Sequence, residues 1–274
     1  MVTPDPLILT VAPNGAYKTH EHHPAVPLTS AALAETAKAC LEAGAAMIHM
    51  HVRRPDGRHL LEAEAYREAT AAVRQAVGQS LVVQITTEAA QVYQPAEQMA
   101  VVRETRPEAV SVGLRELLKP EVPEAELHRF FAWLLEERVM TQVILYDEND
   151  IGHWQRLRAQ GVIPEGPWFL LFVLGRYTAG QTSSPTDLLP FLQKHDGQYP
   201  WAMCAFGPRE NACAITAAGL GGHVRVGFEN NLFLKDGTTA PDNAALVAQV
   251  AEGAAVLGRP LATADDIRSR FGRG

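Results

Sequence analysis

Eight short apolar segments recur along this chain of 274 residues, and a stretch with helical periodicity follows each one. Most of the segments are too short to be helices. Several are rich in valine and isoleucine, which is typical of strands buried on both faces of a parallel sheet. Strands that alternate with helices pair in parallel. The predicted strands are residues 7–11, 47–52, 81–86, 109–114, 141–146, 168–174, 201–206 and 224–228.

Eight strand–helix units in a chain of this length predict an α/β fold of the (β/α)8 barrel type, the TIM barrel, for which about 250 residues is typical. A doubly wound open sheet is the alternative, but residues 12–15 lack the glycine-rich loop that binds dinucleotides. No linker-like stretch interrupts the pattern, so we expect one domain over residues 1–274. The predicted helices are residues 30–44, 62–77, 95–104, 121–138, 151–160, 184–193, 209–219 and 243–257.

Composition narrows the classes of function. Lys and Arg total 24 against 31 Asp and Glu, a net charge of -7, which argues against a general affinity for nucleic acid or an anionic membrane. The three cysteines, Cys40, Cys204 and Cys213, are widely spaced, which fits a reducing compartment rather than a disulfide framework. The chain lacks a bilayer-spanning apolar run and a signal-peptide pattern. We therefore expect a cytoplasmic protein.

His49 and His51 form the most specific chemical signal in the chain. Side chains alternate along a strand, so both imidazoles point to the same side. In a barrel that side is the interior, near the C-terminal end where catalytic residues collect. Neutral imidazole binds zinc and similar metals. The alternative is a pair of hydrogen-bonded core histidines, and we favour the metal site.

Glu229 offers a third metal ligand, because it ends the last predicted strand. In a closed barrel the eighth strand lies beside the first and close to the second, so Glu229 can face the histidine pair. Two histidines and a carboxylate leave an open position, as in catalytic zinc sites. Arg225 shares the inward face of Glu229 and would bind an anionic substrate or form a salt bridge within the barrel.

Weaker signals follow the third and fourth strands. Thr86 and Glu88 share one face at the reactive end and offer a hydroxyl and a possible base. Glu116 follows the fourth strand near the same mouth. The loop after the first strand contains a histidine cluster, His20, His22 and His23. We interpret this loop as solvated or as a cover for the substrate, rather than as a metal site.

Three motifs make the chain resemble the β-keto acid cleavage enzymes almost from end to end. The opening strand and loop are similar to that family at residues 7–16. The histidine strand matches its most specific motif at residues 43–57. The last strand matches its C-terminal motif nearly letter for letter at residues 221–229.

The resemblance implies a TIM barrel that binds Zn²⁺ through His49, His51 and Glu229. It also implies condensation of a β-keto acid with acetyl-CoA, which yields acetoacetate and a new acyl-CoA, in a homodimer or homotetramer. Zinc would act as a Lewis acid on the keto acid. Arg225 and Thr86 would be catalytic.

The chain departs from the family pattern at the base that generates the enolate. The family has an Asp after the terminal Glu, whereas this chain has Asn230. An amide cannot accept a proton as a carboxylate does. Glu88, on the face of Thr86, is the predicted replacement base.

Specificity also departs from the archetype of the family, which binds a substrate ammonium through a Glu in the first loop. The matching residue here is Tyr17, and Leu114 would add an apolar wall. We therefore predict that a 5-amino keto acid is a poor substrate, and that Arg53 and Glu116 also contact the substrate. A second carboxylate on the substrate is conceivable if Arg115 turns inward.

Two other functions fit parts of the sequence. A zinc-dependent, amidohydrolase-like hydrolase also opens with a His-x-His strand, but such sites add His and Asp ligands on later strands. Here Asp147 alone follows strands five to seven at a suitable position, and with Glu148 and Asp150 it is expected to begin a helix. A non-catalytic barrel that binds a metal or metabolite is the second alternative.

Overall fold

The first and last strands of the barrel pair with each other, which closes the sheet. In the computed structural model, which describes residues 5–272, all neighbouring barrel strands run parallel in the order β1-β10-β9-β8-β7-β6-β5-β2. The predicted TIM barrel is therefore confirmed. The barrel strands are Leu9–Val11 (β1), Met47–His49 (β2), Val82–Thr86 (β5), Ala109–Gly113 (β6), Met140–Leu145 (β7), Phe169–Leu174 (β8), Trp201–Ala205 (β9) and His223–Val226 (β10).

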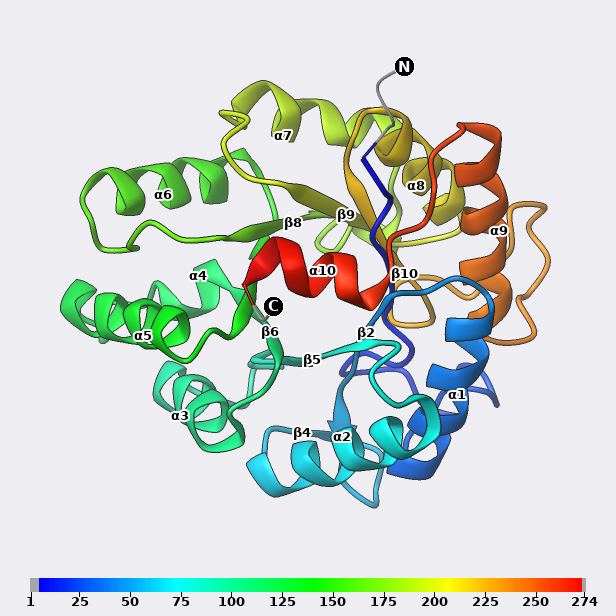
Figure 1. Cartoon of the computed structure of the whole chain (residues 1–274), viewed down its shortest axis with the longest axis horizontal. Helices are drawn as coiled ribbons and strands as arrows, with labels where there is room; N and C mark the ends of the chain where they lie inside the picture. Colours follow the sequence, from blue (N-terminus) through cyan, green and yellow to red (C-terminus); the bar gives the residue numbers. More distant parts are fainter. Residues whose placement is uncertain (1–4, 273–274) are drawn as a thin grey trace.

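Helices form a ring around the strands (Figure 1). Apolar side chains between the strands and these helices make up the main core, to which α5 contributes Phe130 and Phe131 and α6 contributes Trp154. The helices are Ser30–Glu42 (α1), Ala63–Val77 (α2), Pro95–Thr105 (α3), Leu114–Leu117 (α4), Glu124–Glu136 (α5), Glu148–Ala159 (α6), Leu189–Lys194 (α7), Glu210–Gly219 (α8), Asn243–Val256 (α9) and Ala264–Phe271 (α10), with 3-10 turns at Ala179–Gln181 and Pro185–Leu188. None of the helices described in residues 5–272 has the length and apolar character needed to cross a membrane.

Helix α10, which the sequence analysis did not predict, covers one end of the barrel. It lies across the centre of the view in Figure 1. Its Ile267 and Phe271 pack with residues at the beginnings of strands, including Met47, Val82 and Phe169. Thr263 and Asp266 form the capping box that starts the helix. The N-terminal end of the barrel is therefore filled, and the C-terminal end is left for chemistry.

The strand predicted at residues 47–52 is shorter than expected. Its barrel part ends at His49, and the chain then forms a small antiparallel ribbon in which Val52–Arg53 (β3) pairs with His59–Leu60 (β4). The last hydrogen bond to the barrel sheet is donated by the Met50 N–H to Gln84 O. The backbone leaves the sheet after this residue, so the ribbon reaches beyond the barrel mouth. The two histidines nevertheless face the same side.

Candidate active site

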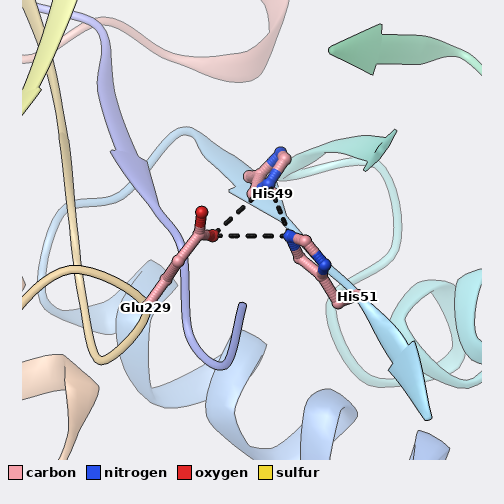
Figure 2. Close-up of side chains that lie close together, drawn as sticks. All are labelled: His49, His51 and Glu229. Atoms are coloured by element: carbon pink, nitrogen blue, oxygen red, sulfur yellow. Dashed lines mark hydrogen bonds and ion pairs between the residues drawn. The ribbon is translucent and has the colours of Figure 1, made fainter. Parts of the chain in front are cut away.

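His49, His51 and Glu229 meet at the C-terminal mouth of the barrel. The Nε2 atoms of the two imidazoles lie 3.1 Å apart, and Glu229 Oε2 lies 3.4 Å from His49 Nε2 and 3.6 Å from His51 Nε2. Figure 2 shows the carboxylate turned toward both rings. All three side chains are buried. Two imidazoles and one carboxylate that converge in this way are a donor set of catalytic zinc sites.

The protonation states of these groups fit a cation. Burial, assisted by the charge of Arg225, lowers the pKa of His49 to about 3, so the imidazole is neutral. Burial opposes ionisation of Glu229, but Arg225 and His49 hold its pKa well below the usual value. Its Oε2 atom is buried without a hydrogen-bond partner. An unpartnered buried carboxylate oxygen is costly unless a cation binds it.

Side chains outside this trio orient it. Gln84 Oε1 lies 2.8 Å from His49 Nδ1, which directs Nε2 toward the site. The register of the barrel pairs these two residues directly across β2 and β5. Asn14 Oδ1 accepts a hydrogen bond from the His51 N–H, and Asn14 Nδ2 donates to His51 O. The first loop thus holds the backbone of His51.

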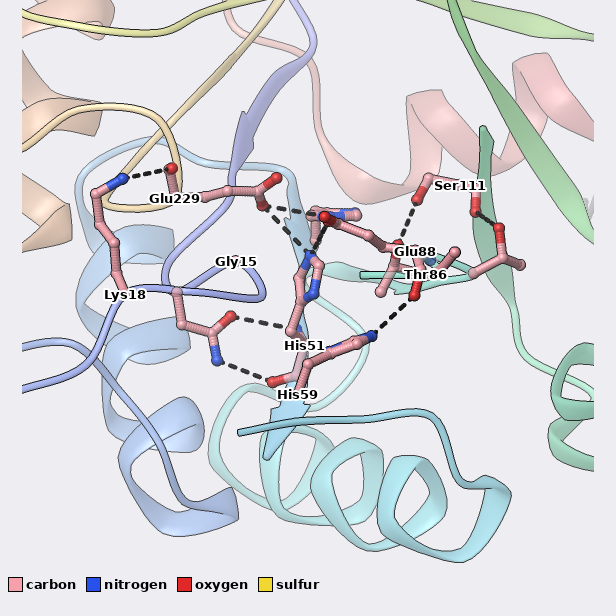
Figure 3. A network of polar contacts seen from close by, with 12 residues as sticks. Gly15, Lys18, His51, His59, Thr86, Glu88, Ser111 and Glu229 are labelled. Carbon is pink, nitrogen blue, oxygen red and sulfur yellow. Dashed lines mark hydrogen bonds and ion pairs between the residues drawn. The ribbon is translucent and has the colours of Figure 1, made fainter. Parts of the chain in front are cut away.

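The segment that carries Glu229 is held from three sides. Arg225 Nη2 donates to Glu229 Oε1 at 3.1 Å. Lys18 Nζ donates to the Glu229 carbonyl oxygen at 2.8 Å, as Figure 3 shows. Glu210, which is fully buried on α8, accepts from the N–H of Gly227 and from the side-chain amide of Asn231. These bonds fix the loop on both sides of the ligand.

An inner pocket adjoins the trio inside the barrel mouth. His49, Arg225 and Glu229 line one side of it. The other side comes from β6, β7 and β8, which lie across the barrel from β2 and β10. These strands and the turns after them contribute Gly113, Glu116, Ile144, Tyr146, Val173 and Arg176.

An outer pocket shares a wall with the inner one. It is lined by the loop after β1, including Tyr17, Lys18 and His22, and by Gln181 from the loop after β8. Tyr17 is 48% exposed, so this pocket opens toward solvent. The shared wall consists of Glu88, Arg176, Phe206 and Glu229.

Thr86 and Glu88 both reach the inner pocket, where the sequence analysis expected them. Thr86 Oγ1 accepts hydrogen bonds from the Glu88 N–H and from the Ser111 hydroxyl. Glu88 Oε2 lies 3.9 Å from His51 Nε2, and its Oε1 accepts from Arg176 Nη2 at 3.3 Å. Figure 3 shows Glu88 beside His51. A carboxylate is therefore available next to the candidate metal ligands.

Asn230 and Arg53 lie near the site but line neither pocket. The amide of Asn230 is buried without a hydrogen-bond partner. Arg53 donates to the carbonyl oxygens of Asn14, Gly15, Lys18 and Gly57. Its guanidinium is thus occupied in holding the first loop, which does not support the substrate contact expected from sequence.

The expectation that Leu114 forms an apolar pocket wall is wrong. The strand ends one residue earlier, and Leu114 begins α4, where it is fully buried in the core between strands and helices. The strand alternation therefore stops before it reaches this residue. Arg115 also turns away from the inner pocket, because its guanidinium bonds Asp147 and Asp150. Asp147 caps α6, as the sequence predicted.

The histidines of the first loop each have a local contact. His20 Nε2 lies 3.0 Å from Val26 O, His22 Nδ1 accepts from the Thr19 N–H, and His23 packs against Phe228. Among residues 5–272, one group of potential metal-ligating side chains converges: His49, His51 and Glu229. The loop interpretation of the histidine cluster agrees with this geometry.

Several site residues were missed in the sequence. Gln84, Lys18, Tyr146, Arg176 and Glu210 reach the site from separate parts of the chain. Gln84 alternates with Thr86 along a strand, which was an available signal. For Arg176 and Glu210 no local pattern marks the contact, because it depends on how distant loops meet.

The fold and the site define a TIM barrel with a cluster of potential metal ligands at its C-terminal mouth. A family model for the beta-keto acid cleavage enzyme matches residues 6–272. The chain belongs to this family and is an enzyme that cleaves β-keto acids. Among curated relatives, the 3-keto-5-aminohexanoate cleavage enzyme of Fusobacterium nucleatum is 32% identical over 96% of each chain.

Other relatives differ in the reactions that their names give. The 3-oxoadipate:acetyl-CoA acetyltransferase of Cupriavidus necator is 27% identical over 97% of this chain and 95% of its own. Among solved structures, apo ObcA has a TM-score of 0.73 at 17% identity, with 91% of this chain and 66% of ObcA covered. This chain therefore spans about two thirds of ObcA, and that likeness supports the barrel fold alone.

Proposed function

We propose that this enzyme is zinc-dependent and condenses a β-keto acid with acetyl-CoA, releasing acetoacetate and a new acyl-CoA. The observation that carries the proposal is the convergence of His49, His51 and Glu229 beside the inner pocket. The name of the Cupriavidus necator relative, an acetyl-CoA acetyltransferase, supports acetyl-CoA as the co-substrate. Bound zinc would supply Lewis acidity that makes the α-proton of the keto acid easier to remove.

Zinc is proposed as the metal because the donor set is two imidazoles and one carboxylate. We expect the purified protein to hold about one zinc per chain, as a single catalytic site does. Metal analysis of the wild type against His49→Ala tests this. Equal metal content in the two proteins would contradict the site.

Arg225 is suited to bind the carboxylate of the keto acid. It lines the inner pocket, and its Nε and Nη1 atoms are buried without partners, although Nη2 is bound to Glu229. Guanidinium donors that face a pocket recognise carboxylates well. We expect Arg225→Ala to lose far more turnover than its loss of stability, measured as the free energy of unfolding, can explain.

Glu88 is suited to remove the α-proton. It lies on the wall that the two pockets share and close to His51. A general base must reach the proton that it abstracts, and Glu88 is a carboxylate in the inner pocket on the side of the metal ligands. Asn230, at the position where the resemblance implies an Asp, carries an amide that cannot serve as this base.

The tail of the keto acid would face the side of the pocket formed by β6 to β8. There the Arg176 guanidinium lies 5.1 Å from the centre of the Tyr17 ring. Tyr17, on the outer-pocket side of Arg176, stands where the resemblance implies a carboxylate for an ammonium, and the Arg176 cation on the wall of the inner pocket disfavours a 5-amino substrate. We expect neutral β-keto acids of short or medium chain to react better. Glu116 would contact their tail.

A hydrolase of the amidohydrolase type is less well supported. The acidic residue after β7, Asp147, caps α6 and pairs with Arg115 instead of joining the metal ligands. A binding protein without catalysis would not need a carboxylate such as Glu88 beside the ligands.

A screen of β-keto acids with acetyl-CoA, followed by acyl-CoA mass, tests the proposed reaction. It should include 3-keto-5-aminohexanoate and 3-ketohexanoate, compared by kcat/KM. We expect a new acyl-CoA and a preference for the neutral compound. Acyl-CoA formation with a clear preference for the amino compound would contradict the predicted specificity but would agree with the proposed reaction.

We also propose that the enzyme is cytoplasmic and forms a homodimer or homotetramer. All three cysteines are free and buried, which suits a reducing compartment. Leu220, Val256 and Leu257 are exposed at the ends of α8 and α9, where association would cover them.

A further inference from the structure

Acetyl-CoA has to bring its thioester to the α-carbon of the keto acid. If the keto acid fills the inner pocket, the acyl end of acetyl-CoA must enter from a space that adjoins this pocket and opens to solvent. The outer pocket meets both requirements, because it shares the wall of Glu88, Arg176, Phe206 and Glu229 and includes the half-exposed Tyr17. This step rests on the function proposed above.

Arg176 stands on this shared wall and is held in place from several directions. Its guanidinium lies 5.1 Å from the centre of the Tyr17 ring and 5.3 Å from the centre of the Phe206 ring. Cation–π contacts of this kind orient an arginine while leaving its N–H edge free. The Gln181 side chain donates to the Arg176 carbonyl oxygen, which fixes the backbone.

The side-chain bonding of Arg176 leaves donors for a substrate. Its hydrogen bond to Glu88 Oε1 is long, at 3.3 Å, and uses Nη2 alone. A guanidinium carries five N–H donors and stays charged. Lys18, the other cation of the outer pocket, does not line the inner pocket, and one of its donors is used by the carbonyl oxygen of Glu229. Arg176 is therefore the cation that can meet an oxygen where the two pockets join.

We propose that the outer pocket binds the acyl end of acetyl-CoA and that Arg176 stabilises the negative charge on the thioester oxygen during acyl transfer. The α-carbon of the deprotonated keto acid attacks the thioester carbonyl carbon. A carbon–carbon bond forms as the carbonyl electron pair moves to oxygen, next to Arg176. Collapse of this oxyanion restores the carbonyl and expels the CoA thiolate. The thiolate then adds to the original keto carbon of the substrate, and cleavage of the bond between that carbon and the α-carbon releases acetoacetate and the new acyl-CoA. Arg176 thus acts after the proton has been removed.

The order of events separates this role from that of Glu88. Exchange of the keto acid α-proton with deuterated water requires deprotonation but no thioester. Acyl-CoA formation requires both steps. In Arg176→Gln we expect exchange without acetyl-CoA to stay within about threefold of the wild type, while acyl-CoA formation falls about 100-fold or more, as when one oxyanion donor is removed. Arg176→Lys should recover part of the transfer rate.

Arg209→Gln is the matched control, because Arg209 is an exposed arginine at the start of α8 that bonds Ser184 and lines neither pocket. Both rates should match the wild type in this variant. An equal fall of exchange and transfer in Arg176→Gln would overturn the inference, because Arg176 would then act through Glu88 or the keto acid. An unchanged transfer rate would overturn it as well.

The wild type distinguishes this inference from the function on which it rests. If the wild type forms no acyl-CoA from any β-keto acid tested, the proposed function and the role of Arg176 both fail. If the wild type forms acyl-CoA and Arg176→Gln forms it equally fast, the proposed function stands and the oxyanion role is wrong.

Discussion

Gly15 lies against the side chain of Glu229, and a Cβ atom at position 15 would come within 2.6 Å of Glu229 Cγ. The backbone of Gly15 has a φ of +60°, which residues with a Cβ atom rarely adopt. The first loop and Glu229, the third candidate metal ligand, are therefore built against each other, and glycine is required at their contact.

Gly15→Ala should weaken metal binding. The added methyl group would push the Glu229 carboxylate away from the histidines, and we expect an affinity loss of about tenfold or more. Competition with a chromogenic chelator measures this. Gly57→Ala is the matched control, because Gly57 also has a positive φ, of +81°, but its Cβ would meet the Thr19 methyl at an ordinary 3.6 Å. Equal metal affinity in both variants would show that Gly15 does not position Glu229.

Gln84→Leu should lower zinc affinity about 10- to 100-fold, as is common when the partner of a metal-binding histidine is removed. The variant removes the acceptor that directs His49 Nδ1, whereas leucine fills a similar volume. Gln142→Leu is the control, since Gln142 contacts Gln84 Nε2 and not the histidine. Zinc affinity that is unchanged in Gln84→Leu would mean that the ring of His49 is oriented by other contacts.

Glu88→Gln should reduce α-proton exchange by about 100-fold or more, the usual effect of losing a general base. Zinc content should remain at the wild-type level, because Glu88 is not one of the three ligands. Exchange is followed by NMR in deuterated water. A wild-type exchange rate in Glu88→Gln would exclude this base, and Asn230→Asp would then be the variant to compare.

Glu116 should make stability depend on pH. Burial and the charge of Glu88 raise its pKa to about 7 from a usual value of 4.5. The folded state thus binds this proton more tightly than the unfolded state, so the contribution of Glu116 to stability is full below pH 4.5 and is lost as the pH rises through 7. The loss amounts to roughly 3 kcal/mol at most.

Glu116→Gln removes this dependence while keeping an oxygen acceptor for the Ala89 N–H and the Gln98 amide. Denaturant unfolding should therefore show that the free energy of unfolding of the variant, relative to that of the wild type, is higher at pH 8 than at pH 5. Glu35→Gln, at an exposed position on α1, controls for a general change of charge. Parallel pH profiles for wild type and Glu116→Gln would contradict the prediction.

The barrel and the convergence of His49, His51 and Glu229 were predictable because the sequence carries a signal for each. Strand alternation places His49 and His51 on one side, and barrel closure brings the last strand to them. Leu114 lies in the core instead of the pocket, and the Arg53 guanidinium bonds the first loop, for the opposite reason. A side chain that follows the end of a strand no longer obeys the alternation, so Leu114 enters a helix and Arg53 turns to the first loop.

Long-range contacts account for what was missed. Gln84 meets His49 through strand register, and Arg176 meets Tyr17 and Glu88 where two loops far apart in the chain come together. Such pairs have no spacing signature in one sequence. Helix α10 does have a local signal, the capping box that begins at Thr263, but the helix is short and was not predicted.

The fate of the acetyl group tests the central claim most directly. Acetyl-CoA labelled with ¹³C at its carbonyl carbon is incubated with 3-ketohexanoate and the zinc-loaded enzyme, with His49→Ala as control. The account predicts that the label appears at the keto carbon of acetoacetate, that the new acyl-CoA is unlabelled, and that His49→Ala forms neither. Label recovered as acetate or retained in acetyl-CoA, without labelled acetoacetate, would contradict acyl transfer at this site.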